Sequence, residues 1–292
     1  MTRYAKVIGL LLVLGGAIYL GTRQRFVIKS VVLSKQTQSG LAKVVQESLA
    51  GTQGTYGVAI KNLKTDESFY ANEHRVFESG SLYKLWVMGV VFNQIENGTV
   101  KEGEILSDNI AQLNTDFGVP LDVAELTDGG ISLSVADALN QMITISHNYA
   151  AFLLTKKVKL ASLQPFLIQN GFKESKVGVN GNSPTTTASD MSLFLEKLYK
   201  GELASSSSTI KMLALLKKQE LNEALPKYLP SEIAVAHKTG DIDLFKNDAG
   251  IVYVPNGDYI IVVLSESPYP YGAEERIAQL SKAVYDYFAA QK

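Results

Sequence analysis

The chain has 292 residues, of which 46% are hydrophobic and 20% are charged, an ordinary composition for a globular protein. Its net charge of −1 creates no field that would attract nucleic acid, so no nucleic-acid partner is expected. The absence of cysteine excludes a disulfide scaffold, a thiol nucleophile and a lipid-anchored cysteine. The three histidines form no metal-ligand spacing, and we expect neither a metal nor a cofactor.

The first 34 residues differ in character from the rest of the chain. Arg3 and Lys6 precede an uncharged apolar run over residues 7–21, and further basic residues follow it between positions 23 and 29. This layout is typical of an export signal or a membrane anchor. No clear small-x-small cleavage site follows, which favours an uncleaved anchor over a cleaved signal peptide. Both alternatives predict an extracytoplasmic protein, either anchored to the cytoplasmic membrane or secreted.

The next segment predicts alternating short elements and one long helix. The apolar spacing indicates an amphipathic helix, then two strands joined by a polar turn. A largely apolar helix follows and ends at Asn97-Gly98, a favourable helix stop. In chain order these elements are expected over residues 41–49, 55–61, 68–71 and 81–96.

The rest of the chain predicts a helical middle and a strand-rich end. A polar, irregular stretch over 100–128 precedes helices that continue from 135 to about 225. Three apolar strands follow, the last two joined by the hairpin turn Pro255-Asn256-Gly257-Asp258, before a closing helix. We therefore predict an α+β fold: an antiparallel sheet flanked by helices and built from both termini, plus an inserted all-helical domain. The expected divisions are 1–34 for the anchor and linker, 35–86 with 225–292 for the α+β domain, and 87–224 for the helical domain.

Chemistry is first indicated by the motif Ser81-Leu82-Tyr83-Lys84. Residues three apart share one face of a helix, so Lys84 can reach Ser81 and act as the base that a serine nucleophile needs. The lysine must be neutral for this role, which requires burial and a nearby positive charge such as Lys238. The alternatives are a helix cap for Ser81 and a solvated surface position for Lys84. The apolar residues after Lys84 argue against the solvated position.

Two further motifs follow in order, Ser146-His147-Asn148 between two amphipathic runs and Lys238-Thr239-Gly240 in a predicted strand. The chain also contains a second S-x-x-K pattern at 208–211 and a second S-x-N pattern at 107–109. We interpret both as accidental, because neither has partner motifs in the right order. His237, directly before the strand motif, is expected to be a packed strand histidine.

These motifs and their surroundings resemble class A β-lactamases, serine acyl enzymes that recognise penicillins. The similarity extends from about Leu41 to the C-terminus. It is carried by residues 77–85, 130–135, 143–151, 184–187 with the following helix over 188–199 and Gly201, 237–240 and 247–251. It implies the same two-domain arrangement, with the site in the cleft between the domains.

The resemblance also implies a role for each residue. Ser81 would be the nucleophile, Ser146 would relay a proton to the leaving nitrogen, and Asn148 would hold the substrate's amide side chain. The remaining substrate contacts would come from the strand region, where Lys238 and Thr239 would bind the substrate carboxylate and Gly240 would allow the substrate to approach closely. The backbone N–H of Asp241 would complete the oxyanion hole with that of Ser81. Lys246 would lie near the carboxylate or be solvated.

One family feature is missing. Class A enzymes carry a Glu-x-x-Leu-Asn motif on an Ω-loop, and its glutamate is the accepted deacylation base. Residues 171–184 are too short for that loop, and Glu174 is their only carboxylate. We do not expect Glu174 to be the base, so the acyl-enzyme should turn over slowly.

Three hypotheses follow. The first is an exported serine hydrolase that opens β-lactam rings through an acyl-enzyme on Ser81. The second is a D-alanyl-D-alanine carboxypeptidase or transpeptidase of the cell wall, a penicillin-binding protein with slow deacylation. The third, a non-catalytic peptidoglycan-binding module, does not need the activated serine. The substrate is therefore a β-lactam or a D-alanyl peptide, and a monomer is expected.

Overall fold

The computed structural model describes residues 40–178 and 182–291. The predicted anchor lies outside the described residues. Within the described part of the chain, no helix is both long and apolar enough to cross a membrane.

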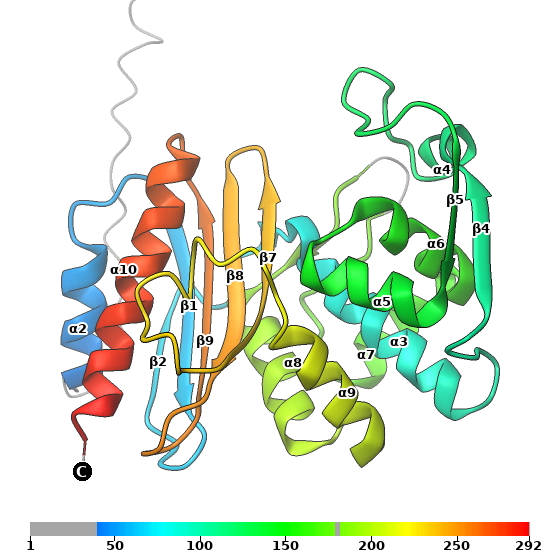
Figure 1. The fold of residues 1–292 in the computed structure, drawn as a ribbon. Helices are drawn as coiled ribbons and strands as arrows, with labels where there is room; N and C mark the ends of the chain where they lie inside the picture. The colour runs from blue at the N-terminus through cyan, green and yellow to red at the C-terminus, as the bar shows by residue number, and fades with distance from the viewer. Residues whose placement is uncertain (1–39, 179–181, 292) are drawn as a thin grey trace, which may run out of the picture. The chain divides into compact units, whose positions relative to one another are not determined.

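A five-stranded antiparallel sheet forms the centre of the fold, with strand order β2-β1-β9-β8-β7. The first strand of the chain lies beside the last, so the sheet is built from both ends of the sequence, as predicted (Figure 1). The strands are β1 (Thr55–Asn62), β2 (Ser68–Ala71), β7 (Val235–Ile242), β8 (Phe245–Val252) and β9 (Tyr259–Glu266). Strand β9 is buried along nearly its whole length, which explains its continuous apolar sequence.

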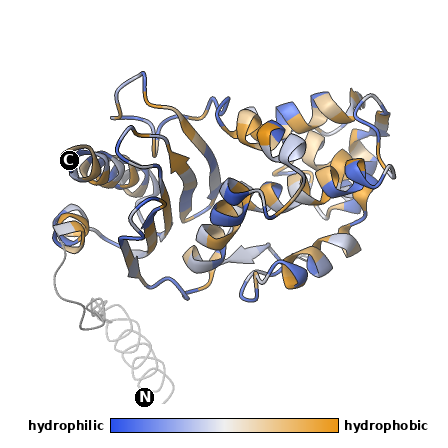
Figure 2. Ribbon diagram, turned by 90° about the horizontal axis from the view of Figure 1, so that it is seen from below, coloured by the Kyte–Doolittle hydropathy of each residue, from blue (hydrophilic) through white to orange (hydrophobic). Residues whose placement is uncertain are grey.

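Helices cover both faces of this sheet. On one face α2 (Gly40–Leu49) packs beside α10 (Pro270–Ala289), and their apolar sides join the strands in one buried cluster. On the other face α8 (Ala188–Lys200) contacts β1, β8 and β9, and α9 (Ser206–Leu216) contacts β7. The helices combine apolar and polar sides, as Figure 2 shows. The predicted antiparallel sheet flanked by helices is therefore confirmed.

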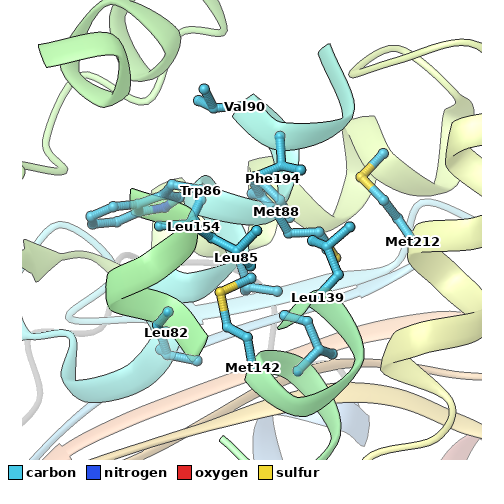
Figure 3. Close-up of a cluster of buried hydrophobic side chains, with 14 of the residues drawn as sticks. Leu82, Leu85, Trp86, Met88, Val90, Leu139, Met142, Leu154, Phe194 and Met212 are labelled. Carbon is cyan, nitrogen blue, oxygen red and sulfur yellow. The ribbon is translucent and has the colours of Figure 1, made fainter. Parts of the chain in front are cut away.

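The long apolar helix α3 (Lys84–Glu96) forms the centre of the second cluster. It contacts three further helices: α5 (Val135–Thr144), α6 (Asn148–Val158) and α7 (Leu163–Gln169). Leu82, Leu85 and Trp86 are fully buried at the start of this region, among side chains of the neighbouring helices (Figure 3). The segment that follows the predicted nucleophile is thus held by core packing.

The polar stretch predicted as irregular contains short regular elements. Strands β4 (Ile105–Asn109) and β5 (Gly130–Ser134) pair antiparallel, and α4 (Ile110–Asp116) lies between them in the chain. The sequence does not reveal β4 because Leu106 is its only buried residue, so apolar alternation is absent. Smaller elements are η2 (Leu160–Ser162) and the paired strands β3 (Phe77–Glu78) and β6 (Thr185–Thr186). The predicted domain boundaries near 87 and 224 remain a prediction.

Candidate active site

Ser81 lies in the short 3-10 helix η1 (Gly80–Tyr83), directly before α3. The backbone N–H of Lys84 donates to the carbonyl of Ser81, so the two residues are one helical turn apart, as the motif predicted. Gly80 has a φ of +48°, and a Cβ there would lie 2.6 Å from the carbonyl carbon of Gly240. A residue without a side chain is needed at this position, because the turn rests directly on β7.

Lys84 is fully buried, which excludes the solvated alternative. Its Nζ donates to the Ser146 carbonyl, to Ser146 Oγ at 3.1 Å and to Asn148 Oδ1 at 2.7 Å. Burial holds the pKa of Lys84 well below its usual value, the charge of Lys238 lowers it further, and the carboxylate of Glu125 acts in the opposite direction. These conditions favour the neutral amine that a general base requires.

The hydroxyl of Ser81 makes no hydrogen bond to the residues that the structure describes. The expected contact between Ser81 Oγ and Lys84 Nζ is therefore not formed here. The partners of the lysine all lie on the Ser146-His147-Asn148 segment. Catalytic hydrogen bonds often become short only when substrate is bound, so the geometry is compatible with a Ser81–Lys84 pair.

Ser146 occupies the turn between α5 and α6, as the sequence predicted, with an unusual φ of +59°. Its Oγ accepts from Lys84 Nζ at 3.1 Å and from Lys238 Nζ at 3.0 Å. One hydroxyl therefore connects two buried lysines. The left-handed backbone at a non-glycine residue marks a conformation held in place by its surroundings. His147 has a structural role here, because its Nδ1 accepts the N–H of Ala150 at 3.1 Å and caps α6.

Lys238 is also fully buried, on the edge strand β7. Its Nζ donates to the carbonyl of Thr239 at 2.9 Å in addition to Ser146 Oγ. Burial lowers the pKa of Lys238 to about 8, opposed by the carboxylates of Asp248 and Asp241. The lysine therefore loses its proton at a lower pH than a solvated lysine does.

His237, which precedes Lys238 in β7, forms a buried pair with Asp248 that the motifs did not indicate. His237 Nδ1 is 3.0 Å from Asp248 Oδ1, and its Nε2 is 3.1 Å from Asn222 Oδ1. Asp248 Oδ2 also accepts the backbone N–H of Leu225 at 3.0 Å. His237 is 1% exposed, so the prediction of a packed strand histidine is confirmed.

Gly240, the glycine of the strand motif near the end of β7, is also needed for packing against the turn before η1. A Cβ on Gly240 would lie 2.3 Å from the carbonyl oxygen of Ser79, which directly precedes η1. Lys246 Nζ pairs with Asp241 Oδ2 at 2.7 Å and lies 3.6 Å from Glu274 Oε1. The roles of Thr239, Gly240, Asp241 and Lys246 toward a substrate remain predictions.

The glutamates Glu174 and Glu125 differ in their contacts. Glu174 Oε2 accepts from Thr187 Oγ1 at 3.0 Å and lies 3.1 Å from His74 Nδ1, so its carboxylate is occupied away from the lysines. Glu125 Oε1 instead accepts from Asn148 Nδ2 at 2.6 Å. The sequence did not indicate Glu125, because it belongs to no motif. The only available signal was its place in the polar stretch expected to border the site.

Among the residues that the structure describes, no group of three or more His, Asp or Glu side chains could hold a metal ion. The arrangement is that of a serine acyl-transfer site: a hydroxyl at a helix start, a desolvated lysine one turn away, and a second hydroxyl between two lysines.

A family model described as the β-lactamase enzyme family matches residues 40–288. The chain therefore belongs to this family and is a serine hydrolase of the class A β-lactamase type.

Individual relatives agree with this assignment. The chain is 26% identical over 272 residues to the extended-spectrum β-lactamase PER-1 of Pseudomonas aeruginosa, covering 86% of this chain and 88% of the relative. A β-lactamase from Sphaerobacter thermophilus DSM 20745 is 25% identical, with a TM-score of 0.76 over 88% of this chain and 100% of that one. A mutant of PBP-A, solved as its acyl-enzyme complex with penicillin G, is also 25% identical, with a TM-score of 0.74 and coverages of 86% and 96%.

Proposed function

We propose that the protein opens the amide of β-lactams by forming an acyl-enzyme on Ser81, which water then hydrolyses. The observation that carries this proposal is the position of Ser146 Oγ between the two buried lysines, 3.1 Å from Lys84 Nζ and 3.0 Å from Lys238 Nζ. A module that only binds its ligand does not need two desolvated lysines, whose burial is costly.

The proposed steps use the groups of this site. Ser81 Oγ attacks the carbonyl carbon of the β-lactam, and its proton passes to the neutral amine of Lys84. The oxyanion develops between the backbone N–H groups of Ser81 and Asp241, in the manner of an oxyanion hole. The C–N bond then breaks, and the leaving nitrogen takes a proton from the Ser146 hydroxyl. Ser146 in turn receives the proton that Lys84 took from Ser81.

Substrate recognition uses the remaining groups. The charge of Lys238 and the hydroxyl of Thr239 attract the substrate carboxylate at the edge of the sheet. Lys246 contributes to this positive region, although its pairing with Asp241 reduces its effect. Asn148 Nδ2 donates to the carbonyl of the substrate's side-chain amide.

A second candidate function is a D-alanyl peptidase or transpeptidase that β-lactams acylate and whose acyl-enzyme is hydrolysed slowly. The observation that favours it is the placement of Glu174, whose carboxylate contacts Thr187 and His74 rather than the lysines. Without a positioned base for the hydrolytic water, deacylation loses a factor of about 10²–10⁴. Both candidates use the same acylation machinery and differ in the rate of the second step.

The test is a time course of intact protein mass after mixing the full chain with benzylpenicillin, with Ser81→Ala as control. A transient adduct that returns to free enzyme supports the β-lactamase. A persistent adduct supports the peptidase, which hydrolysis of a D-alanyl-D-alanine peptide would then confirm. No adduct together with no consumption of benzylpenicillin, or an equal adduct on Ser81→Ala, would exclude both and leave the non-catalytic module.

We further propose that the enzyme acts outside the cytoplasmic membrane. The support is the basic-apolar-basic pattern of the first 29 residues. Protease treatment of intact cells tests the location, because an extracytoplasmic domain is digested once the outer layers are permeabilised. The N-terminal mass of the recovered protein separates an uncleaved anchor from a cleaved signal.

A further inference from the structure

Glu125 places a carboxylate at the mouth of the candidate site. It lies in the segment between α4 and β5, and its exposed side chain accepts from Asn148 Nδ2 at 2.6 Å. The other end of the same amide, Asn148 Oδ1, accepts from the buried Lys84 Nζ at 2.7 Å. The Asn148 amide therefore spans from the catalytic lysine to the exposed carboxylate.

These two contacts fix which way the amide of Asn148 points. A carboxylate only accepts hydrogen bonds, so the NH₂ end must face Glu125 and the oxygen must face Lys84. An amide nitrogen carries two hydrogens, and one of them remains for a substrate carbonyl. Glu125 is thus a positioning residue for the group expected to bind the substrate.

The backbone beside Glu125 is held by a buried side chain. Tyr149 is 2% exposed, and its hydroxyl accepts the N–H of Leu126 at 3.0 Å and lies 2.7 Å from the Leu126 carbonyl. Asn114 Nδ2 donates to the same carbonyl at 2.8 Å. The carboxylate of Glu125 is therefore set in a defined place, although it is exposed to solvent.

We propose that Glu125 makes the enzyme prefer acyl donors with a positively charged group beside the amide that Asn148 binds. This inference rests on the proposed function. A carbonyl oxygen that accepts from Asn148 Nδ2 lies about 5 Å from the Glu125 carboxylate, given ordinary hydrogen-bond lengths and angles. A cation on the adjacent carbon is attracted, and an anion in the same place is repelled.

Three penicillins that differ at a single carbon provide the probes. Benzylpenicillin carries hydrogen on the carbon next to its side-chain carbonyl, ampicillin an ammonium group and carbenicillin a carboxylate. The measurement is the second-order rate constant of adduct formation on Ser81, followed by intact mass. Because the two charged penicillins differ in intrinsic reactivity, the informative quantity is their rate ratio in each variant relative to the ratio in the native enzyme.

We expect the ampicillin-to-carbenicillin ratio to fall about ten-fold in Glu125→Gln, the product of two exposed charge effects of about three-fold each. Glu125→Lys should lower this ratio further. With both rate constants divided by that for benzylpenicillin, carbenicillin should then react faster than ampicillin, the reverse of the order in the native enzyme. A role limited to orienting Asn148 would not reverse with the sign of the charge. Asp128→Asn is the matched control, because it removes the same charge from the same segment, and its ratio should stay within about two-fold.

Each other result overturns the inference. An unchanged ratio in both Glu125 variants, while adducts still form, rejects the role of Glu125 and leaves the proposed function intact. An equal fall in Asp128→Asn shows a general field instead of a local contact. If none of the three penicillins forms an adduct on the native enzyme and none is consumed, the proposed function fails and this inference fails with it.

Discussion

Replacing Gly240 by alanine tests whether β7 positions Ser81, the proposed nucleophile. The added Cβ would lie 2.3 Å from the Ser79 carbonyl oxygen and 2.8 Å from Leu82 Cγ, whereas ordinary contact begins at 3.4 Å. The turn that carries Ser81 must therefore move by about 1 Å, because close-packed interiors contain no free space to absorb the methyl group. A displacement of this size can lower a catalytic rate by about 10²-fold.

The same substitution should also destabilise the fold. Overpacking of a tight site costs about 1–3 kcal/mol, and each kcal/mol lowers Tm by about 2–4 °C in a domain of this size. The assays are the rate of adduct formation with benzylpenicillin and a thermal unfolding curve. Gly103→Ala is the matched control, because a Cβ at Gly103 meets no atom within 4 Å. A Gly240→Ala enzyme that acylates within about three-fold of the native rate would refute the reasoning.

Three further predictions concern charge. The acylation rate should rise as pH passes the lowered pKa of Lys84, whose neutral form is the proposed base, and should fall above about pH 8 as Lys238 loses its proton. A rate that still increases at pH 9 would contradict this. Asp248→Asn should move the alkaline fall to lower pH, because the Asp248 charge raises the pKa of Lys238, and circular dichroism should verify that this variant is folded. Glu174→Gln should leave the deacylation rate within about two-fold, and a large loss would restore Glu174 as the base.

The parts of the fold that the sequence predicted are those whose local and tertiary preferences agree. The apolar run of α3 is helical in propensity and buried in the core, and the turn at 255–258 has a glycine with a φ of +136° between two paired strands. The Ser81-x-x-Lys84 spacing could be interpreted because one helical turn converts sequence separation directly into proximity.

The missed features depend on contacts between distant segments. Strand β4 is mostly exposed and carries no apolar alternation, so only its pairing with β5 defines it. Glu125 approaches Asn148 across 23 positions, and nothing in its local sequence marks that contact. The packing of Gly240 on the turn before η1, where an added Cβ would lie 2.3 Å from the Ser79 carbonyl oxygen, was not indicated by its motif. These relations arise only after the chain has folded.

The pairing of β1 with β9 has a consequence for biosynthesis. Thr55 lies opposite Glu266 and Asn62 opposite Tyr259. Strand β1 can therefore pair with β9 only after roughly 200 further residues have been synthesised, and such non-local pairing slows folding. The strand that carries Lys238 reaches β1 only through β8 and β9. A nascent chain that stops before β9 holds Ser81 and Lys84 but cannot complete the sheet that supports Lys238. Under the proposed function, labelling with a fluorescent penicillin would therefore mark the moment at which a newly made molecule finishes folding.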